Sequence, residues 1–297
     1  MISVLIPVKN GGDDLRRCLG GITQQEIVEE VEIVVVDSGS TDGSIDHAES
    51  VGARVVRITA DDFVHGSARN LAAREANGDL LVFTSQDAVA ASPVWLASLA
   101  AAARSRPDAA GAYGRQLPHE GARPPERFFL DFLYGPRARV QRLAPDDELT
   151  FETTIFSNVN SAIPRAVWHE HPFGDEVTMS EDQEWSRRML RAGRVLVYEP
   201  EAAVRHSHTY TLRSAFRRFY VSGVSAEHSY VEGLGSRRAL RRAGLRYARR
   251  ELRWLLATGQ VHWLPYTILY ELTKFAGLQL GIRHARLPRA LAARLGR

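Results

Sequence analysis

Short apolar runs, each ending on a polar loop, are the feature that most constrains the fold of this chain. The runs lie at residues 2–8, 31–36, 54–58 and 80–83. Segments with helical spacing of apolar residues separate them, as at residues 67–76. Adjacent parallel strands need a crossover connection, usually a helix, whereas antiparallel strands can be joined by a short turn. The alternation therefore predicts an α/β fold with a mostly parallel central sheet flanked by helices.

Acidic side chains stand at the polar ends of two of these strands. Asp37 follows the second run directly, and Asp87 lies in the polar tip that follows the fourth run. Open α/β sheets bind ligands at the carboxyl ends of their strands, where a carboxylate can accept hydrogen bonds from a base or ribose. The alternative is that both residues only close turns, for which Asp, Ser and Gly are common. The N-terminal half contains no GxGxxG and no P-loop motif, which disfavours both of those nucleotide sites.

The composition is that of a soluble globular protein, with 44% hydrophobic and 25% charged residues. The single cysteine, Cys18, cannot form an internal disulfide, which fits a reducing compartment. Residues 1–8 lack the basic start and small-residue cleavage site of a signal peptide, so we interpret them as a first strand. We therefore expect a cytoplasmic protein.

Charge is distributed unevenly along the chain. Residues 211–297 contain 17 Lys and Arg against 4 Asp and Glu, although the whole chain carries only +3. The pattern there changes to long helices, so we expect a catalytic domain at residues 1–210 and a basic helical extension at residues 211–297. Pro265, Glu271 and Lys274 interrupt its most apolar stretch and disfavour a membrane span.

Such a basic extension with aromatic residues favours an acidic partner. Peripheral contact with the inner face of an anionic membrane is one interpretation, and a helical packing module with a solvated basic face is another. Nucleic acid is a third class of acidic partner, but the extension contains no recognised nucleic-acid-binding motif. We therefore do not expect nucleic acid to be a partner.

A second informative segment begins at Ser180. Ser180 and Gln183 form a capping-box pattern, which predicts the start of a helix that ends near Gly193. Asp182 then lies in the first turn, where the helix dipole favours an ionised carboxylate by ~0.3–1 kcal/mol. Such a carboxylate suits a general base. The alternative is that Glu181 and Asp182 only complement the dipole.

Several short motifs occur in a fixed order over roughly residues 1–225. They are VLIPVKN at 4–10, VVVDSGSTDG at 34–43, FVHGSARN at 63–70, SQDA at 85–88, SNVNSA at 157–162, SED at 180–182 and VRHSH at 204–208. Together they resemble the family 2 glycosyltransferases with the GT-A fold. The third and fourth motifs narrow the resemblance to the branch of bacterial rhamnosyltransferases.

The resemblance implies a nucleotide-sugar donor bound at the strand ends. It places uracil or thymine near Asp37 and the loop at residues 7–10, and the guanidinium of Arg69 near the diphosphate, where such a group suits paired phosphate oxygens. From the local sequence alone, Arg69 is a surface cation on a helix. The residues expected to bind the donor are Pro7, Val8, Asn10, Asp37, His65, Gly66, Arg69, Ser85, Gln86 and Asp87.

The resemblance also implies a divalent cation, Mg²⁺ or Mn²⁺, on the donor diphosphate. Family members usually present Asp-x-Asp to the metal, and here Ser85 stands in place of the first carboxylate, so that Asp87 remains. One carboxylate and substrate phosphates can suffice for such a cation. His206 and His208 are two residues apart and can face the same side of an extended segment. In the GT-A pattern a histidine at this point binds the metal, and of the two we prefer His206. The alternative is that both are loop histidines that bind no metal.

The implied reaction is an inverting sugar transfer with Asp182 as general base and Glu181 in support. The expected donor is dTDP-rhamnose, and the expected acceptor is a surface glycan or a lipid-linked saccharide. A UDP-sugar, such as a UDP-hexose or UDP-galactofuranose, is the alternative donor. A catalytically silent module that binds nucleotide or membrane is the alternative from another class.

Overall fold

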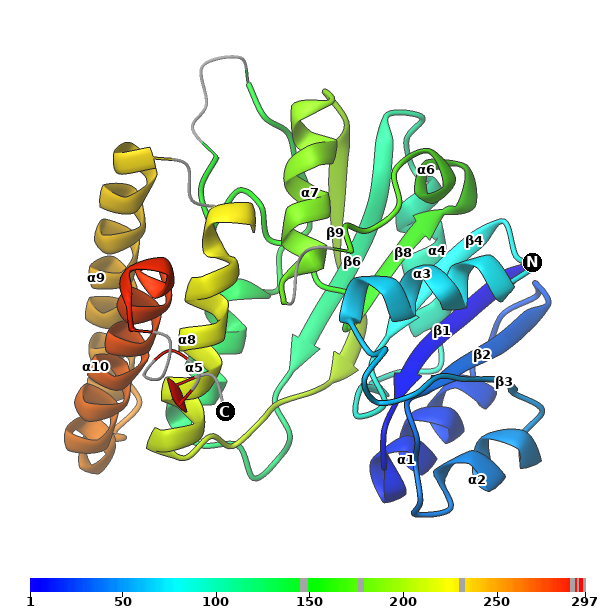
Figure 1. Ribbon diagram of the computed structural model, residues 1–297, viewed down its shortest axis with the longest axis horizontal. Helices are drawn as coiled ribbons and strands as arrows, with labels where there is room; N and C mark the ends of the chain where they lie inside the picture. The colour runs from blue at the N-terminus through cyan, green and yellow to red at the C-terminus, as the bar shows by residue number, and fades with distance from the viewer. Residues whose placement is uncertain (145–148, 176–178, 230–232, 289–291, 293, 296–297) are drawn as a thin grey trace.

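The computed structural model describes residues 1–297 except 145–148, 176–178, 230–232, 289–291, 293 and 296–297. A central sheet lies between two layers of helices, and a group of long helices stands at one side of it (Figure 1). The predicted α/β class with a C-terminal helical extension is therefore confirmed.

The nine strands of the described sheet follow the order β3-β2-β1-β4-β8-β6-β9-β5, with β7 pairing to β9. β1 to β4 are all parallel to one another, as the sequence predicts. The second half is mixed, because β8 runs antiparallel to both β4 and β6. The strands are β1 (Ile2–Val8), β2 (Val31–Asp37), β3 (Arg54–Arg57), β4 (Leu80–Thr84), β5 (Val89–Ala90), β6 (Ala109–Leu117), β7 (Arg139–Gln141), β8 (Asn160–Pro164) and β9 (Val195–Arg205).

Helices cover both faces of the sheet, which explains why its central strands are mostly apolar on both sides. In β1, Val4 and Ile6 face one core and Leu5 faces the other. One face carries α1 (Gly12–Thr23), α2 (Ser44–Ser50) and α4 (Trp95–Arg104). The opposite face carries α3 (His65–Glu75), α5 (Pro124–Leu133), α6 (Arg165–Glu170) and α7 (Glu181–Arg191).

The extension consists of α8 (Leu212–Ser229), α9 (Gly233–Ala257) and α10 (Leu264–Gly281). α8 and α10 approach so closely that a Cβ on Gly277 would lie 2.5 Å from the Phe216 carbonyl oxygen, and one on Gly281 would lie 2.1 Å from that of Tyr220. Glycine at these two positions, four residues apart, is what permits the contact. None of the helices in the described part of the chain is long and apolar enough to span a membrane.

A buried lysine ties the extension to the sheet domain. The ammonium of Lys274 on α10 lies 4.9–5.3 Å from the ring centroids of Phe129 on α5, Phe219 on α8, Tyr247 on α9 and Tyr270 on its own helix. A desolvated cation over an aromatic face contributes about 2 kcal/mol. The extension therefore packs directly on the body through α5, while the division into two domains at residues 210 and 211 stays a prediction.

Candidate active site and metal centre

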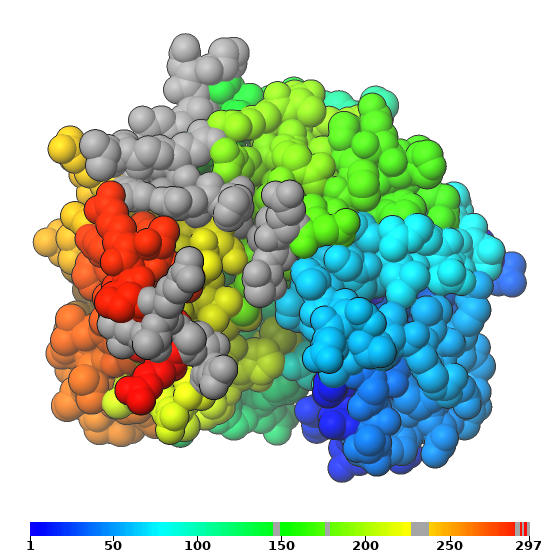
Figure 2. All heavy atoms as spheres, in the orientation of Figure 1, coloured from blue at the N-terminus to red at the C-terminus, as the bar shows by residue number. Residues whose placement is uncertain are grey.

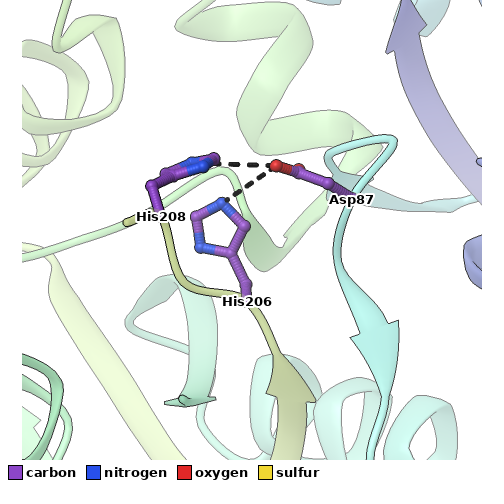
Figure 3. A group of neighbouring side chains, drawn as sticks. All are labelled: Asp87, His206 and His208. Atoms are coloured by element: carbon purple, nitrogen blue, oxygen red, sulfur yellow. Dashed lines mark ion pairs between the residues drawn. The ribbon is translucent and has the colours of Figure 1, made fainter. Parts of the chain in front are cut away.

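Asp87 and two histidines converge at one edge of the sheet. Asp87 lies in the turn between β4 and β5, and β5 pairs with the end of β9, which brings this turn beside His206 and His208. The Oδ2 atom of Asp87 lies 3.6 Å from Nε2 of His206 and 3.7 Å from Nε2 of His208 (Figure 3). The three residues predicted to bind the metal therefore lie within reach of one another, while their role as ligands stays a prediction.

The two histidines lie close together because the chain continues straight out of β9. β9 extends from Val195 to Arg205, so His206 follows the strand at once. Their ring centroids are 4.6 Å apart. Residues two apart in an extended chain point to one side, which accounts for the pairing.

The hydrogen bonding of His206 leaves one of its ring nitrogens free for a ligand. Its Nδ1 lies 2.9 Å from Oε1 of Gln116, and an amide oxygen only accepts, so Nδ1 carries the hydrogen and Nε2 keeps its lone pair towards Asp87. Burial lowers the pKa of His206 to about 4, so the imidazole is neutral at pH 7. A neutral imidazole with a fixed tautomer is the form that binds a metal.

These residues fit a divalent cation. One carboxylate oxygen and two imidazole nitrogens lie within 4.8 Å of one another. Imidazole ligands suit Mn²⁺ better than Mg²⁺, which prefers oxygen ligands. We predict that a divalent cation binds here, and the two imidazole ligands favour Mn²⁺.

Asp182 is held in place by two backbone hydrogen bonds at the start of α7. The residue lies in the first turn of α7, as predicted, and its side chain is partly buried. Its Oδ1 accepts from the Gln183 backbone N–H at 2.8 Å, and its Oδ2 accepts from the Asn158 backbone N–H at 3.2 Å. Burial and the neighbouring negative charge of Glu181 raise the pKa of Asp182 to about 7. A base whose pKa lies near the working pH is efficient at proton transfer.

The predicted capping box at this helix is wrong. Ser180 is the N-cap residue, but its side chain makes no capping hydrogen bond, and its backbone adopts φ 66° in the left-handed region. Among the described residues, only Asn10 shares a positive φ without being glycine. Such conformations cost free energy and gather at functional sites. Asn10 is itself a predicted donor-binding residue, and Ser180 directly precedes Glu181.

Glu181 and Arg69 form a buried ion pair. Nη1 of Arg69 lies 2.7 Å from Oε1 of Glu181, and the two side chains are 7% and 6% exposed. Burial opposes ionisation of Glu181, but the Arg69 guanidinium, His65 and the hydrogen bonds to the carboxylate together outweigh it and hold the pKa of this carboxyl below its usual value. Glu181 therefore stays charged, and its charge acts on Asp182 beside it. The contact of Arg69 with a diphosphate stays a prediction.

Asp37 closes a turn, which is one of the two interpretations that the sequence left open. Its carboxylate accepts from the backbone N–H groups of Gly39 and Ser40 and from the Ser40 hydroxyl at 2.6 Å. Asn10 joins this turn, since its side-chain oxygen accepts from the Thr41 N–H at 2.8 Å. The turn thereby holds the loop after β1 in place, and contact with a base stays a prediction.

Gln86 fastens the tip of β4 to the loop after β1. Its side-chain oxygen accepts from the Lys9 N–H at 2.9 Å, and its amide donates to the Lys9 carbonyl at 3.2 Å. The Val8 carbonyl accepts from Ser38, and Pro7 pairs in register with Val36 of β2. These contacts place the predicted donor-binding segments side by side.

The remaining predicted donor residues lie at the start of α3 and after β4. His65 is half-buried, and burial lowers its pKa. A Cβ on Gly66 would lie 2.5 Å from the Gly174 carbonyl oxygen, so this glycine lets α3 approach the loop before α7. The Ser85 carbonyl accepts from the Ala88 N–H and so shapes the turn that presents Asp87. Their contact with a donor stays a prediction.

Sequence reasoning gave no role to the polar residues that connect the two halves of this site. Nε2 of Gln116 donates to the Ser157 hydroxyl at 3.0 Å, while its Oε1 accepts from His206. The neighbouring Asn158 bonds both Glu181 and Asp182. Ser157 and Asn158 belong to the SNVNSA motif at residues 157–162, but Gln116 lies on β6 with no local signal, and only the fold reveals its position.

Replacing Gln116 with leucine is expected to weaken Mn²⁺ binding about 10- to 100-fold, the usual effect of removing an outer partner of a metal-ligating histidine. Leucine cannot accept from Nδ1, so the tautomer of His206 is no longer fixed. Calorimetry measures the affinity and ¹⁵N NMR of the imidazole reports the tautomer. Gln25→Leu, which removes a side chain bonded at residues 21 and 92, is the control. Unchanged affinity in Gln116→Leu would contradict this role.

The amino-acid sequence is similar to that of known glycosyltransferases. The sequence profile described as glycosyl transferase family 2 matches residues 3–171. The O-antigen chain rhamnosyltransferase RfbN of Salmonella typhimurium is 32% identical over 295 residues, which are 97% of this chain and 91% of the relative. The O-antigen chain rhamnosyltransferase WbaN of Salmonella anatum is 29% identical over 293 residues, or 96% and 90%.

Solved structures share the fold. The mannosyltransferase PcManGT from Pyrobaculum calidifontis, in complex with GDP-Man and Mn²⁺, superposes with a TM-score of 0.64 at 17% identity and covers 95% of this chain and 86% of its own. S. aureus TarS 1–349 with UDP-GlcNAc gives 0.53 at 18% identity, covering 78% and 68%. The predicted GT-A fold is confirmed. Together with the family profile and the relatives, this shows that the chain is a glycosyltransferase and belongs to glycosyl transferase family 2.

Proposed function

We propose that this glycosyltransferase transfers rhamnose from dTDP-rhamnose to a glycan acceptor, with inversion at the anomeric carbon. Two features of the same chain carry the proposal. Asp87, His206 and His208 form a group that could hold a metal ion, and Asp182 is a carboxylate with the pKa of a general base. The two whole-length relatives, both described as O-antigen chain rhamnosyltransferases, support rhamnose as the sugar.

Asp182 is the proposed general base. Its carboxylate takes the proton of the acceptor hydroxyl as the acceptor oxygen bonds to the anomeric carbon and the bond from that carbon to the diphosphate oxygen breaks. A single displacement of this kind inverts the configuration. The Asn158 N–H fixes one carboxylate oxygen, and burial together with the charge of Glu181 raises the pKa of Asp182 towards the pH at which it would accept a proton.

We propose that the nucleotide-sugar donor binds at the carboxyl ends of β1, β2 and β4. Asp87, His206 and His208 would hold a divalent cation there. When bound, the cation neutralises charge that develops on the departing diphosphate. The turns at Asp37 and Asn10, which hold the neighbouring loops, are the proposed walls of the nucleotide site.

Catalysis should depend on pH through Asp182. Only the ionised carboxylate accepts a proton, and its pKa of about 7 predicts that kcat/KM rises with pH, passes its midpoint near pH 7 and levels off above it. Initial rates between pH 5.5 and 9 at saturating Mn²⁺ measure this. A profile that is flat across this range would contradict the assignment.

We propose a lipid-linked or surface glycan as the acceptor and the cytoplasmic face of the cell membrane as the place of reaction. The acceptor is inferred from the relatives, which are described as O-antigen chain enzymes. The strong positive charge of the extension supports a location beside anionic lipid.

Calorimetric titration of dTDP-rhamnose, UDP-glucose and UDP-galactose, each with and without Mn²⁺, tests the donor. We expect Mn²⁺-dependent binding of dTDP-rhamnose that is at least tenfold tighter than that of either UDP-sugar. Preference for a UDP-sugar would overturn the donor and leave the family membership intact. Failure of all three to bind at any metal concentration would overturn the catalytic proposal and favour a silent module.

A further inference from the structure

We propose that one exposed face, formed jointly by α9 and α10, docks on an anionic lipid surface. The inference rests on the proposed function only in its choice of a membrane as the place of reaction. Seven of the ten large hydrophobic side chains that are exposed among the described residues lie in α9, in α10 or between them. The seven are Leu245, Leu256, Val261, Ile268, Leu269, Leu272 and Phe275.

α10 has one buried side and one exposed side that carries apolar side chains. The inner side, with Thr267, Tyr270 and Lys274, is buried towards α8 and the body. On the outer side, Leu272 is 61% exposed and Phe275 is 49% exposed. An apolar stripe at helical spacing normally faces a core, so this stripe is a helix face without a partner within the described chain.

The exposed stripe of α9 runs alongside that of α10. Residues 241, 245, 249, 252 and 256 recur at helical spacing and lie on one line of α9. The guanidinium of Arg241 reaches the side chain of Gln279 at 3.4 Å, and Gln279 continues the line of Leu272 and Phe275 on α10. The two lines therefore meet, and Leu245 and Leu256, 63% and 56% exposed, extend the apolar face across both helices. We call this joint surface the α9–α10 face.

Arginines border the α9–α10 face. Arg241 and Arg249 lie on the same line as Leu245, and Arg242 and Arg253 are exposed beside it. Figure 1 shows α9 and α10 at the side of the molecule opposite β3, and Figure 2 shows the atoms of α10 at the surface there. Apolar side chains that enter the acyl boundary, with cations at headgroup level, match a membrane surface that carries negative charge.

A second copy of the chain fits this face less well. A two-fold contact places the same patch on both subunits, so the bordering arginines of one copy would meet those of the other. Anionic headgroups instead supply the opposite charge.

Co-sedimentation of the full chain with vesicles tests the proposal. We expect binding to vesicles containing phosphatidylglycerol, little binding to pure phosphatidylcholine, and weakening by salt. Leu272→Ser with Phe275→Ser should lower binding at least tenfold, and Arg241→Gln with Arg249→Gln should lower it several-fold. Val28→Ser with Val140→Ser, which removes two exposed apolar side chains elsewhere, is the matched control and should leave binding unchanged.

Equal vesicle binding by the wild type and the Leu272/Phe275 variant would overturn the proposal. It would also be overturned if gel filtration showed a wild-type dimer that this variant splits, because the face would then hold a second copy. Calorimetric titration of dTDP-rhamnose without vesicles separates this result from the proposed function. The variant should bind the donor as tightly as the wild type does. A wild type that binds vesicles but not the donor would support the membrane contact of the α9–α10 face and contradict the proposed function.

Discussion

Asp182→Asn is expected to lower kcat by about 10²–10⁴-fold, the range that general-base catalysis contributes. The amide cannot accept the proton of the acceptor hydroxyl. Its oxygen can still accept from the Asn158 N–H, so the start of α7 should keep its structure. Release of dTDP from dTDP-rhamnose in the presence of acceptor measures the rate, and calorimetry should show donor affinity within a factor of about three of the wild type.

Glu184→Gln is the matched control, because Glu184 lies in the same first turn of α7 and pairs with Arg188 instead. Its turnover should stay near that of the wild type. Normal turnover by folded Asp182→Asn would remove Asp182 from the mechanism. A loss of turnover of equal size in Glu184→Gln would mean that the helix start, and not one carboxylate, sets the rate.

Arg69→Leu is expected to destabilise the protein by about 3–5 kcal/mol, because it leaves the buried carboxylate of Glu181 without its cation. Urea unfolding measures the change. Arg17→Leu is the control: this arginine pairs with Asp14 on the surface, with both side chains more than half exposed, so its loss should cost no more than about 1 kcal/mol.

A double variant gives the prediction a second readout. Replacing both partners of a buried ion pair with apolar residues removes the uncompensated charge, so Arg69→Leu with Glu181→Leu should be more stable than Arg69→Leu alone. If Arg69→Leu unfolds at the same urea concentration as the wild type, the ion pair does not hold α3 to α7. If the double variant is the less stable of the two, the cost lies in packing and not in charge.

The strands in the first half of the fold can be predicted from local sequence patterns, whereas the strand order in the second half cannot. Residues 2–8 and 80–83 read as buried strands because both faces of a covered parallel sheet are apolar, and the structure confirms them as β1 and β4. The antiparallel insertion of β8 between β4 and β6 depends on which strands meet across the sheet. No local pattern carries that information.

The candidate site divides in the same way. His206 and His208 could be paired from the sequence because residues two apart share a side in an extended chain. Arg69 is a surface cation by its local sequence, but the structure buries it against a carboxylate 112 positions later. Gln116 gave no signal at all, because a glutamine in a strand becomes a histidine's partner only when β6 and β9 lie side by side.

Titration of Mn²⁺, followed by electron paramagnetic resonance, tests the central claim most directly. The claim is that Asp87, His206 and His208 hold a divalent cation that serves the donor's diphosphate. We predict one Mn²⁺ per chain in the wild type, bound more tightly when dTDP is present, and loss of this site in Asp87→Ala. Equal, weak binding by both proteins, with no effect of dTDP, would contradict the claim.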